Sequence, residues 1–298
     1  MDYFIHIGTL MLIYLLLAQS MNLYLGYTGI LALSHIAFFG IGAYSTAIIT
    51  LNGGSHILGL MIGLLISIIL GVLLGITSIR LKADYLGIAT LGFTQIISSF
   101  MQNWDTLTRG PLGLPGIPRP SIFGFLLSEK SSYFVFTLLI TAVLMFLMFK
   151  IVRSRYGMTL EAIRDDEIAA KSIGINTVKY KLIIFCFGAS IASIAGFLYA
   201  HFITYIDPVS FHLNELSLIL VMTIIGGLGT FRGPFLGVLF ITLIFEPLRF
   251  IGLPSQYLGA LRMMIYSLFF LVTMIYVPAG LGGFMKFKKR NRRKMINY

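Results

Sequence analysis

Long apolar stretches, separated by short polar interruptions, make up most of the chain. A helix needs about 20 mostly apolar residues to cross the hydrocarbon core of a bilayer, and nine segments approach or reach this length. They comprise residues 4–25, 29–51, 57–79, 85–102, 132–152, 181–205, 214–231, 235–251 and 258–277. Several are short or interrupted by glycine, as in helices that break inside a protein. The pattern therefore predicts an all-α polytopic membrane protein with about 8–10 transmembrane helices, some of them broken.

The composition supports this class. Of 298 residues, 57% are hydrophobic and 11% are charged, whereas about 25% of the residues in a soluble domain are charged. The net charge is +11, and seven positive charges lie in the string KFKKRNRRK near the C-terminus. Such a segment beside a membrane helix binds anionic head groups, so membrane lipids are expected partners and nucleic acid is not. We expect one transmembrane domain at residues 1–285 and a basic cytoplasmic tail at residues 286–298.

One charged island interrupts the apolar pattern. Residues 150–181 hold eleven charged residues, seven positive and four negative. Ionised groups are costly in hydrocarbon, so the island is expected to lie in water between two spans. Its excess of Lys and Arg indicates the cytoplasmic side. If all nine segments cross the membrane, the N-terminus then lies outside and the C-terminus lies in the cytoplasm.

The island is predicted to form two short helices. Its apolar residues do not follow one helical stripe, which argues against a single straight amphipathic helix. Asp166 can cap a second helix that runs from Glu167 to Ile173, and Gly174 is typical of the residue that ends a helix. The alternative is a solvated cytoplasmic linker, but the capped ends favour docking onto a partner.

Part of the island resembles a known family. The string EIAAKSIG, with Glu167, the pair Ala169-Ala170 and Gly174, resembles the cytoplasmic coupling loop of ABC-importer permeases. The longer string LEAIRDDEIAAKSIGIN is similar to the version in branched-chain amino acid permeases of the LivM type. Three further strings carry the same resemblance: GYTGILALSHIAFFGIGAY, TRGPLGLPGIP and MTIIGGLGTFRGPFLGVLFITLIFEPLR.

The resemblance implies a set of partners and a docking site. Residues 153–176 would form the coupling loop that binds cytoplasmic ABC ATPase subunits. A second homologous permease subunit of the LivH type and an external substrate-binding protein are the other implied partners. The residues expected at the ATPase contact are Gly157, Leu160, Glu161, Ala162, Ile163, Arg164, Asp165, Asp166, Glu167, Ile168, Ala169, Ala170, Lys171, Ser172, Ile173, Gly174, Ile175 and Asn176.

The implied function is that of a permease subunit in an ATP-driven importer. It would move leucine, isoleucine and valine across the cytoplasmic (inner) membrane of a prokaryote. The sequence has no G-x-x-x-x-G-K-[ST] phosphate loop, so ATP is expected to be bound by the partner subunit, with no cofactor on this chain. An alternative within the same superfamily is a urea or short-amide permease.

Two other function classes fit the sequence less well. An ion-coupled secondary transporter also has broken helices, but it ordinarily needs ionisable groups inside the membrane. Here the acidic residues cluster near the ends of the predicted spans. No set of His, Cys or carboxylate residues converges as a metal site or a catalytic centre, so the chain is not expected to be an enzyme.

Polar residues inside the apolar segments are candidates for the path of a small polar solute. The expected path residues are Asn22, Ser34, His35, Thr90, Thr94 and Gln95. The alternative is that these side chains form hydrogen bonds between packed helices. Two loops have distinct patterns. TRGPLGLPGIP predicts an ordered external loop that either contacts the binding protein or only connects two spans, and GGLGTFRGP predicts a tight cytoplasmic turn.

Overall fold

A computed structural model of the protein describes residues 2–78, 83–122, 125–126, 129–245, 264–265, 267–269, 271–272, 275 and 280–282. The predicted basic tail (286–298) and most of the ninth apolar segment (258–277) lie outside the described residues. The described residues therefore test the first eight predicted segments and the charged island.

The described chain is almost entirely helical, and the predicted all-α polytopic membrane fold is confirmed. Its helices are α1 (Asp2–Thr28), α2 (His35–Leu51), α3 (His56–Ser78), α4 (Ala83–Asn103), α5 (Asp105–Thr108), α6 (Lys130–Arg153), α7 (Arg155–Asp165), α8 (Glu167–Ser172), α9 (Thr177–Ile203), α10 (Leu213–Gly226) and α11 (Gly233–Phe245). Each of the first eight predicted segments overlaps one of these helices. Among the described residues, α1, α3, α6 and α9 are long and apolar enough to cross a membrane.

The remaining elements lie in the loops. Two short 3-10 helices, η1 (Gly110–Leu112) and η2 (Pro208–Phe211), flank two pairs of two-residue strands. Strand β1 (Leu114–Pro115) pairs antiparallel with β4 (Tyr205–Ile206), and β2 (Ser121–Ile122) pairs antiparallel with β3 (Phe125–Leu126). The glycine- and proline-rich loop after α4 is thus ordered, as its sequence predicts.

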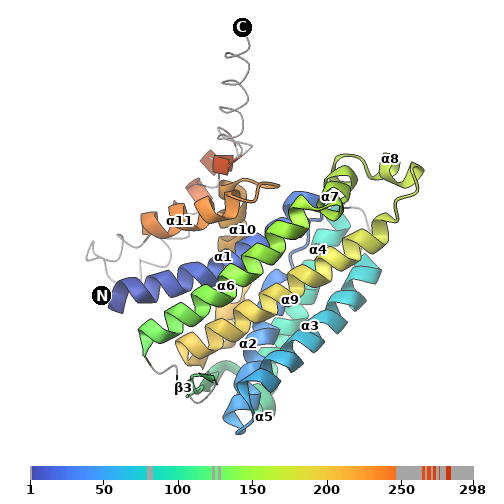
Figure 1. Ribbon diagram of the computed structural model, residues 1–298. Helices are drawn as coiled ribbons and strands as arrows, with labels where there is room; N and C mark the ends of the chain where they lie inside the picture. The colour runs from blue at the N-terminus through green and yellow to red at the C-terminus, as the bar shows by residue number, and fades with distance from the viewer. Residues whose placement is uncertain are drawn as a thin grey trace.

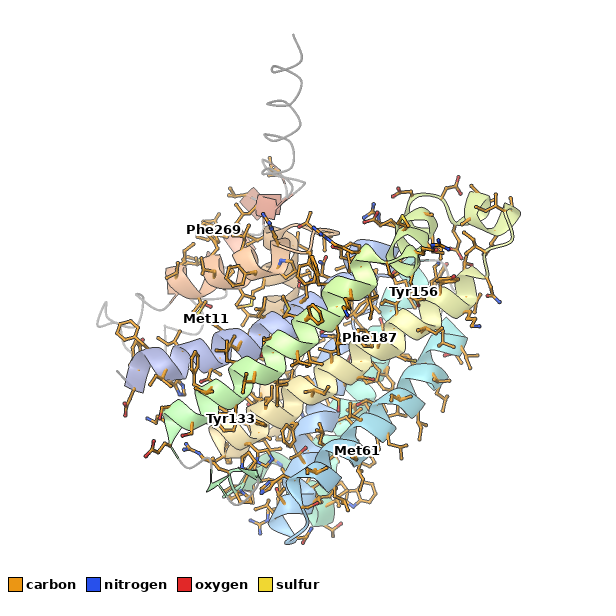
Figure 2. All side chains as sticks on the ribbon, viewed as in Figure 1. Met11, Met61, Tyr133, Tyr156, Phe187 and Phe269 are labelled. Atoms are coloured by element: carbon orange, nitrogen blue, oxygen red, sulfur yellow. The ribbon has the colours of Figure 1, made fainter. Side chains whose placement is uncertain are left out.

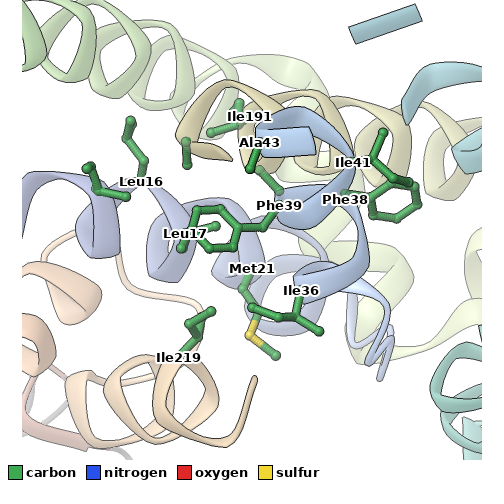
Figure 3. Close-up of a cluster of buried hydrophobic side chains, with 14 of the residues drawn as sticks. Leu16, Leu17, Met21, Ile36, Phe38, Phe39, Ile41, Ala43, Ile191 and Ile219 are labelled. Carbon is green, nitrogen blue, oxygen red and sulfur yellow. The ribbon is translucent and has the colours of Figure 1, made fainter. Parts of the chain in front are cut away.

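The core forms around α9, which contacts α1, α2 and α3 (Figure 1). Helices α2 and α9 approach so closely that a Cβ atom at Gly42 would overlap the backbone of Ser193. A Cβ atom at Gly196 would overlap the carbonyl group of Phe39. Small residues at a helix contact allow this approach, which is how membrane helices gain packing energy. Figure 3 shows the apolar side chains of α1, α2, α9 and α10 beside this contact, among them Leu16, Leu17, Met21, Phe38, Phe39, Ile191 and Ile219.

A predicted break separates α1 from α2. Residues 29–34 are not helical, and Gly29 has a φ of 70°. The backbone of Leu33 in this segment is bound by α4: its N–H donates to Thr90 Oγ1, and its carbonyl accepts from Thr94 Oγ1, both at 2.9 Å. Non-helical backbone is tolerated among membrane helices where protein satisfies its polar groups. The two threonine hydroxyls meet that requirement here.

Helix α10 is shorter than its apolar segment predicts. Its 14 residues span about 21 Å, less than the about 30 Å of a hydrocarbon core. It begins at Leu213, directly after η2, in which Asp207 Oδ1 accepts from the N–H of Ser210 at 3.0 Å. It ends at Gly226, because Gly227 has a φ of 114°. The predicted turn between α10 and α11 is confirmed, but α10 by itself does not cross the membrane.

The outer faces of α3 and α6 are apolar along most of each helix, and Figure 2 shows Met61 on the α3 face. Large exposed side chains on these faces include Ile57, Met61, Leu65, Ile69 and Leu73 of α3 and Val135, Leu139, Val143 and Phe146 of α6. So large an apolar surface is unfavourable in water. In a membrane protein, faces of this composition suit contact with lipid.

The close contact of α2 with α9 makes a testable prediction. Gly196→Ala should destabilise the protein by about 1–3 kcal/mol, because the added methyl group would overlap the Phe39 carbonyl and force the helices apart. Thermal unfolding in detergent measures this loss. Gly92→Ala on α4 is the matched control, since a Cβ atom there has no neighbour within 4 Å. Equal melting temperatures for the two variants would contradict the packing argument.

Candidate coupling site

The charged island forms two short helices, α7 and α8, at one end of the bundle between α6 and α9 (Figure 1). Each begins with a capping side chain. Ser154 Oγ accepts from the N–H of Tyr156 at 3.1 Å, and Asp166 Oδ1 accepts from the N–H groups of Ile168 and Ala169 at 2.9 and 3.0 Å. The predicted pair of helices and the N-cap role of Asp166 are confirmed.

Gly174 terminates α8 through its backbone conformation. The N–H of Gly174 donates to the carbonyl of Lys171 at 3.0 Å, and the N–H of Ile175 donates to that of Ala170 at 3.1 Å. These two bonds form a Schellman motif, which needs a left-handed residue after the cap. Gly174 supplies it with a φ of 88°. Asn176 then caps α9, with its Oδ1 accepting from the N–H of Lys179 at 3.1 Å.

The two helices bury one side and expose the other. Gly157, Leu160 and Ile163 of α7 are buried, as is Ala170 of α8. Three large apolar side chains point outward instead: Ile168 is 79% exposed, Ile173 is 77% exposed and Met158 is 61% exposed. The other expected contact residues that are exposed are Ala162, Arg164, Asp165, Asp166, Ala169, Lys171, Ser172, Gly174 and Asn176, while Glu161, Glu167 and Ile175 are half-buried.

Glu167 ties α8 to α9. Its carboxylate accepts from Lys181 Nζ at 2.6 Å and from Thr177 Oγ1 at 3.1 Å, both on α9. Lys171 Nζ, one turn further along α8, lies 3.0 Å from the same carboxylate. Partial burial raises the pKa of the Glu167 carboxyl, but the bonds from Lys181 and Lys171 outweigh burial and lower the pKa from 4.5 to about 2. The carboxylate therefore stays ionised at physiological pH.

Arg164 ties α7 to the end of α1. Its Nη1 donates to the carbonyl oxygen of Gly26 at 2.9 Å. Its Nε and Nη2 donate to Asp165 Oδ1 at 3.1 and 2.9 Å. The guanidinium group is thus held between the adjacent carboxylate and α1.

The predicted path residues do not form one cluster. Ser34, His35, Thr90 and Thr94 surround the break between α1 and α2. His35 Nε2 lies 2.9 Å from Ser20 Oγ, and Ser34 Oγ is buried without a hydrogen-bond partner in the part of the chain that the structure describes. The two threonines bind Leu33, as described above. The role of these four residues in a solute path stays a prediction.

The other two path candidates lie elsewhere. Asn22 is fully buried and binds the turn between α10 and α11: its Oδ1 accepts from the N–H of Gly229 at 2.9 Å, and its Nδ2 donates to the carbonyl of Thr230 at 3.0 Å. Gln95 is exposed on α4, about 100° around the helix from Thr94. These two residues therefore cannot line the same surface as Thr90 and Thr94.

The sequence does not predict two polar contacts between α4 and His212. Gln102 Nε2 of α4 lies 2.6 Å from His212 Nε2, and Ser98 Oγ lies 3.5 Å from His212 Nδ1. Ser98 and Gln102 are four positions apart on one helix face, which was a usable signal. Lys181, the partner of Glu167, was missed because only the fold brings α8 back to α9.

The comparisons with known proteins show the family of the chain. A family model described as "Branched-chain amino acid transport system / permease component" matches residues 3–278. The chain belongs to this family. It is 30% identical to the high-affinity branched-chain amino acid transport system permease protein LivM of Escherichia coli (strain K12), over 76% of this chain and 59% of the relative.

Two further relatives belong to the same set. The probable branched-chain amino acid transport permease protein LivM of Methanocaldococcus jannaschii is 27% identical over 90% of each chain. The permease protein LivH of Escherichia coli (strain K12) is 27% identical over 63% of this chain and 61% of its own length. The chain thus spans less than two thirds of the E. coli relatives that it matches. No solved structure matches it.

The end of α8 provides a direct test of the Schellman motif. Gly174→Val should destabilise α8 locally by about 1 kcal/mol or more, because a β-branched residue resists a positive φ. Faster hydrogen exchange of the α8 amides would report this loss. Gly174→Asn is the control, since asparagine tolerates the left-handed conformation. Identical exchange in both variants would rule out backbone strain as the cause.

The clamp on Glu167 makes a pH-dependent prediction. Because its folded pKa lies below the ordinary value, its contribution to stability is complete above about pH 4.5 and is lost as the pH falls toward 2. The carboxylate is 33% exposed, so solvent screening keeps the effect modest. An NMR titration of the labelled side-chain carboxyl measures the pKa. In Lys181→Gln the midpoint should move upward, and an unchanged midpoint would contradict the clamp.

Proposed function

We propose that this chain is a permease subunit of an ATP-driven importer that moves leucine, isoleucine and valine across the cytoplasmic membrane of a prokaryote. The observation that carries the proposal is the pair α7 and α8. Their ends are capped, Glu167 and Arg164 fix them to the bundle, and Ile168 and Ile173 project outward from them. Exposed apolar side chains on an ordered element are typical of a protein interface.

The partner proposed for this surface is a cytoplasmic ABC ATPase subunit. It would bind the ATP, and this chain would need no cofactor. The excess of Lys and Arg around α7 and α8 supports a cytoplasmic position for that end of the bundle. Helix α1 begins at the other end, so the N-terminus would lie outside. The basic tail would return to the cytoplasm beside anionic lipids.

The outward face of α4 supports a second permease subunit of the LivH type as a neighbour. Unlike the outer sides of α3 and α6, this face carries an exposed amide side chain, Gln95, among apolar residues. A side-chain amide in contact with lipid is costly. A solute path between the two permease subunits would explain a polar side chain at this position. Gln95 is the predicted path residue that this arrangement favours.

The loop after α4 would meet the external substrate-binding protein. It lies at the opposite end of the bundle from α8, where β1 pairs with β4 (Figure 1). Leu112 in η1 is 81% exposed. An ordered loop with an exposed apolar tip can form a specific contact. The substrate-binding protein would select the amino acid before the permease receives it.

One observation favours a second candidate function, an ion-coupled transporter. Glu215 Oε2 accepts from Tyr14 Oη at 3.0 Å, and Tyr14 lies midway along α1. A carboxylate at this position is further from the membrane surface than the sequence indicates, and such groups often carry protons or ions. The two functions differ in the source of energy, which an uptake measurement separates.

Uptake by the reconstituted complex tests the energy source and the cargo. Proteoliposomes that contain the complex and the binding protein should accumulate labelled leucine only when ATP is enclosed with the ATPase subunits. Unlabelled isoleucine and valine should compete, and urea should not. Accumulation that needs an ion gradient and ignores ATP would replace the proposal with the second candidate. Competition by urea or short amides would change the cargo.

Cysteine crosslinking tests the docking surface. After Cys186→Ser, Ile168→Cys and Ile173→Cys should each form crosslinks to the ATPase subunit with a short bifunctional reagent. Leu112→Cys is a matched control, because Leu112 has nearly the same exposure, 81% against 79% for Ile168, but lies at the opposite end. Equal crosslinking from both ends, or none from α8, would contradict ATPase docking there.

A further inference from the structure

Gly229, in the turn between α10 and α11, lies directly between α7 and α1. A Cβ atom at Gly229 would lie 2.6 Å from Arg164 Nη1 and 2.9 Å from the carbonyl oxygen of Gly26. Gly229 also has a φ of 66°, a conformation that suits glycine. The end of α1, α7 and the turn between α10 and α11 therefore meet here. Because Gly229 has no side chain, its backbone can lie next to both Arg164 and Gly26.

Hydrogen bonds join the same three elements. Arg164 of α7 donates to the carbonyl of Gly26 at 2.9 Å. One turn earlier on α1, the Asn22 amide binds the backbone of Gly229 and Thr230 at 2.9 and 3.0 Å. Asn22 is fully buried, so its bonds are shielded from competing water. The turn is held to α1 on one side and contacts the α7 guanidinium on the other.

Helix α10 connects this contact to a polar contact at its far end. Its 14 residues form a rod of about 21 Å. His212 immediately precedes the rod, and its ring contacts Gln102 and Ser98 of α4. A displacement of the turn would therefore tilt α10 and move His212 relative to α4. Rigid elements of this kind can carry energetic coupling between distant sites.

We infer that Arg164, Gly229 and Asn22 form a joint that transmits movement of α7 to the hairpin of α10 and α11. This inference rests on the proposed import function and deepens it. Arg164 and Asn22 act through the turn and are positioning residues. Asn22 is thereby assigned to this joint, and not to the solute path that its polarity predicts.

Comparison of two glycine variants tests the joint in the assembled importer. Gly229→Ala introduces both a strained φ and a methyl group between Arg164 and Gly26. Gly53→Ala carries the same kind of strain, since Gly53 has a φ of 79°, but a Cβ atom there would have no neighbour within 4 Å. Gly229→Ala should lower uptake per ATP hydrolysed by about 5- to 150-fold, the usual range of such coupling. Gly53→Ala should leave that ratio unchanged.

Amide hydrogen exchange tests the joint without transport. In the purified full chain, Arg164→Gln and Asn22→Ala should each accelerate exchange in residues 228–232. Lys179→Gln, an exposed lysine on α9, should not. Arg164→Lys should restore part of the protection, because lysine keeps one charged donor. A double variant that exchanges no faster than the more affected single variant would indicate that the two residues act as one unit.

The two measurements separate this inference from the import proposal. If the wild-type complex shows no ATP-driven uptake, the import proposal fails, while the exchange experiment still reports on the joint. Unchanged exchange in Arg164→Gln would overturn the joint. So would an unchanged ratio of uptake to ATP hydrolysis in Gly229→Ala, because the turn would then carry no coupling.

Discussion

Inside a bilayer, every backbone N–H and C=O group must find a partner within the protein, and this constraint governs where the chain can leave the helical conformation. At the break after α1, Thr90 and Thr94 bind the amide and carbonyl groups of Leu33. At the turn after α10, Asn22 binds one amide and one carbonyl group. Side chains on continuous helices thus replace part of the missing helical bonds.

Helices α7 and α8 depend on a different kind of interaction, because they lie at the end of the bundle and bury few side chains. Their order comes from caps: Ser154, Asp166 and Asn176 bind free amides at three helix starts, and Gly174 allows the Schellman bonds at one helix end. Glu167 adds a clamp to α9. Capping and ion pairing together give the two small helices a fixed orientation relative to the bundle.

The sequence predicted what depends on neighbours along the chain. Asp166 and Gly174 were found because a cap binds groups within four residues of itself, and the apolar segments were found because hydropathy is a local property. The length of α10 was overestimated, since hydropathy continues across Gly227, where the backbone turns. The role of Asn22 could not be found, because its partners lie 207 and 208 positions away. Polarity marked it as unusual, and only the fold identified its partners.

Ser154 and Asp166 each serve two helices at once, the first ending α6 and starting α7, the second ending α7 and starting α8. Only one residue separates α6 from α7, and only one separates α7 from α8. Inserting one residue at either position would turn the following helix by about 100° and would turn a different face outward. The direction in which each helix faces is therefore encoded in chain length as well as in side chains. A change of an exposed side chain leaves these directions as they are, whereas an insertion or deletion at these two positions changes the direction of the helices that follow.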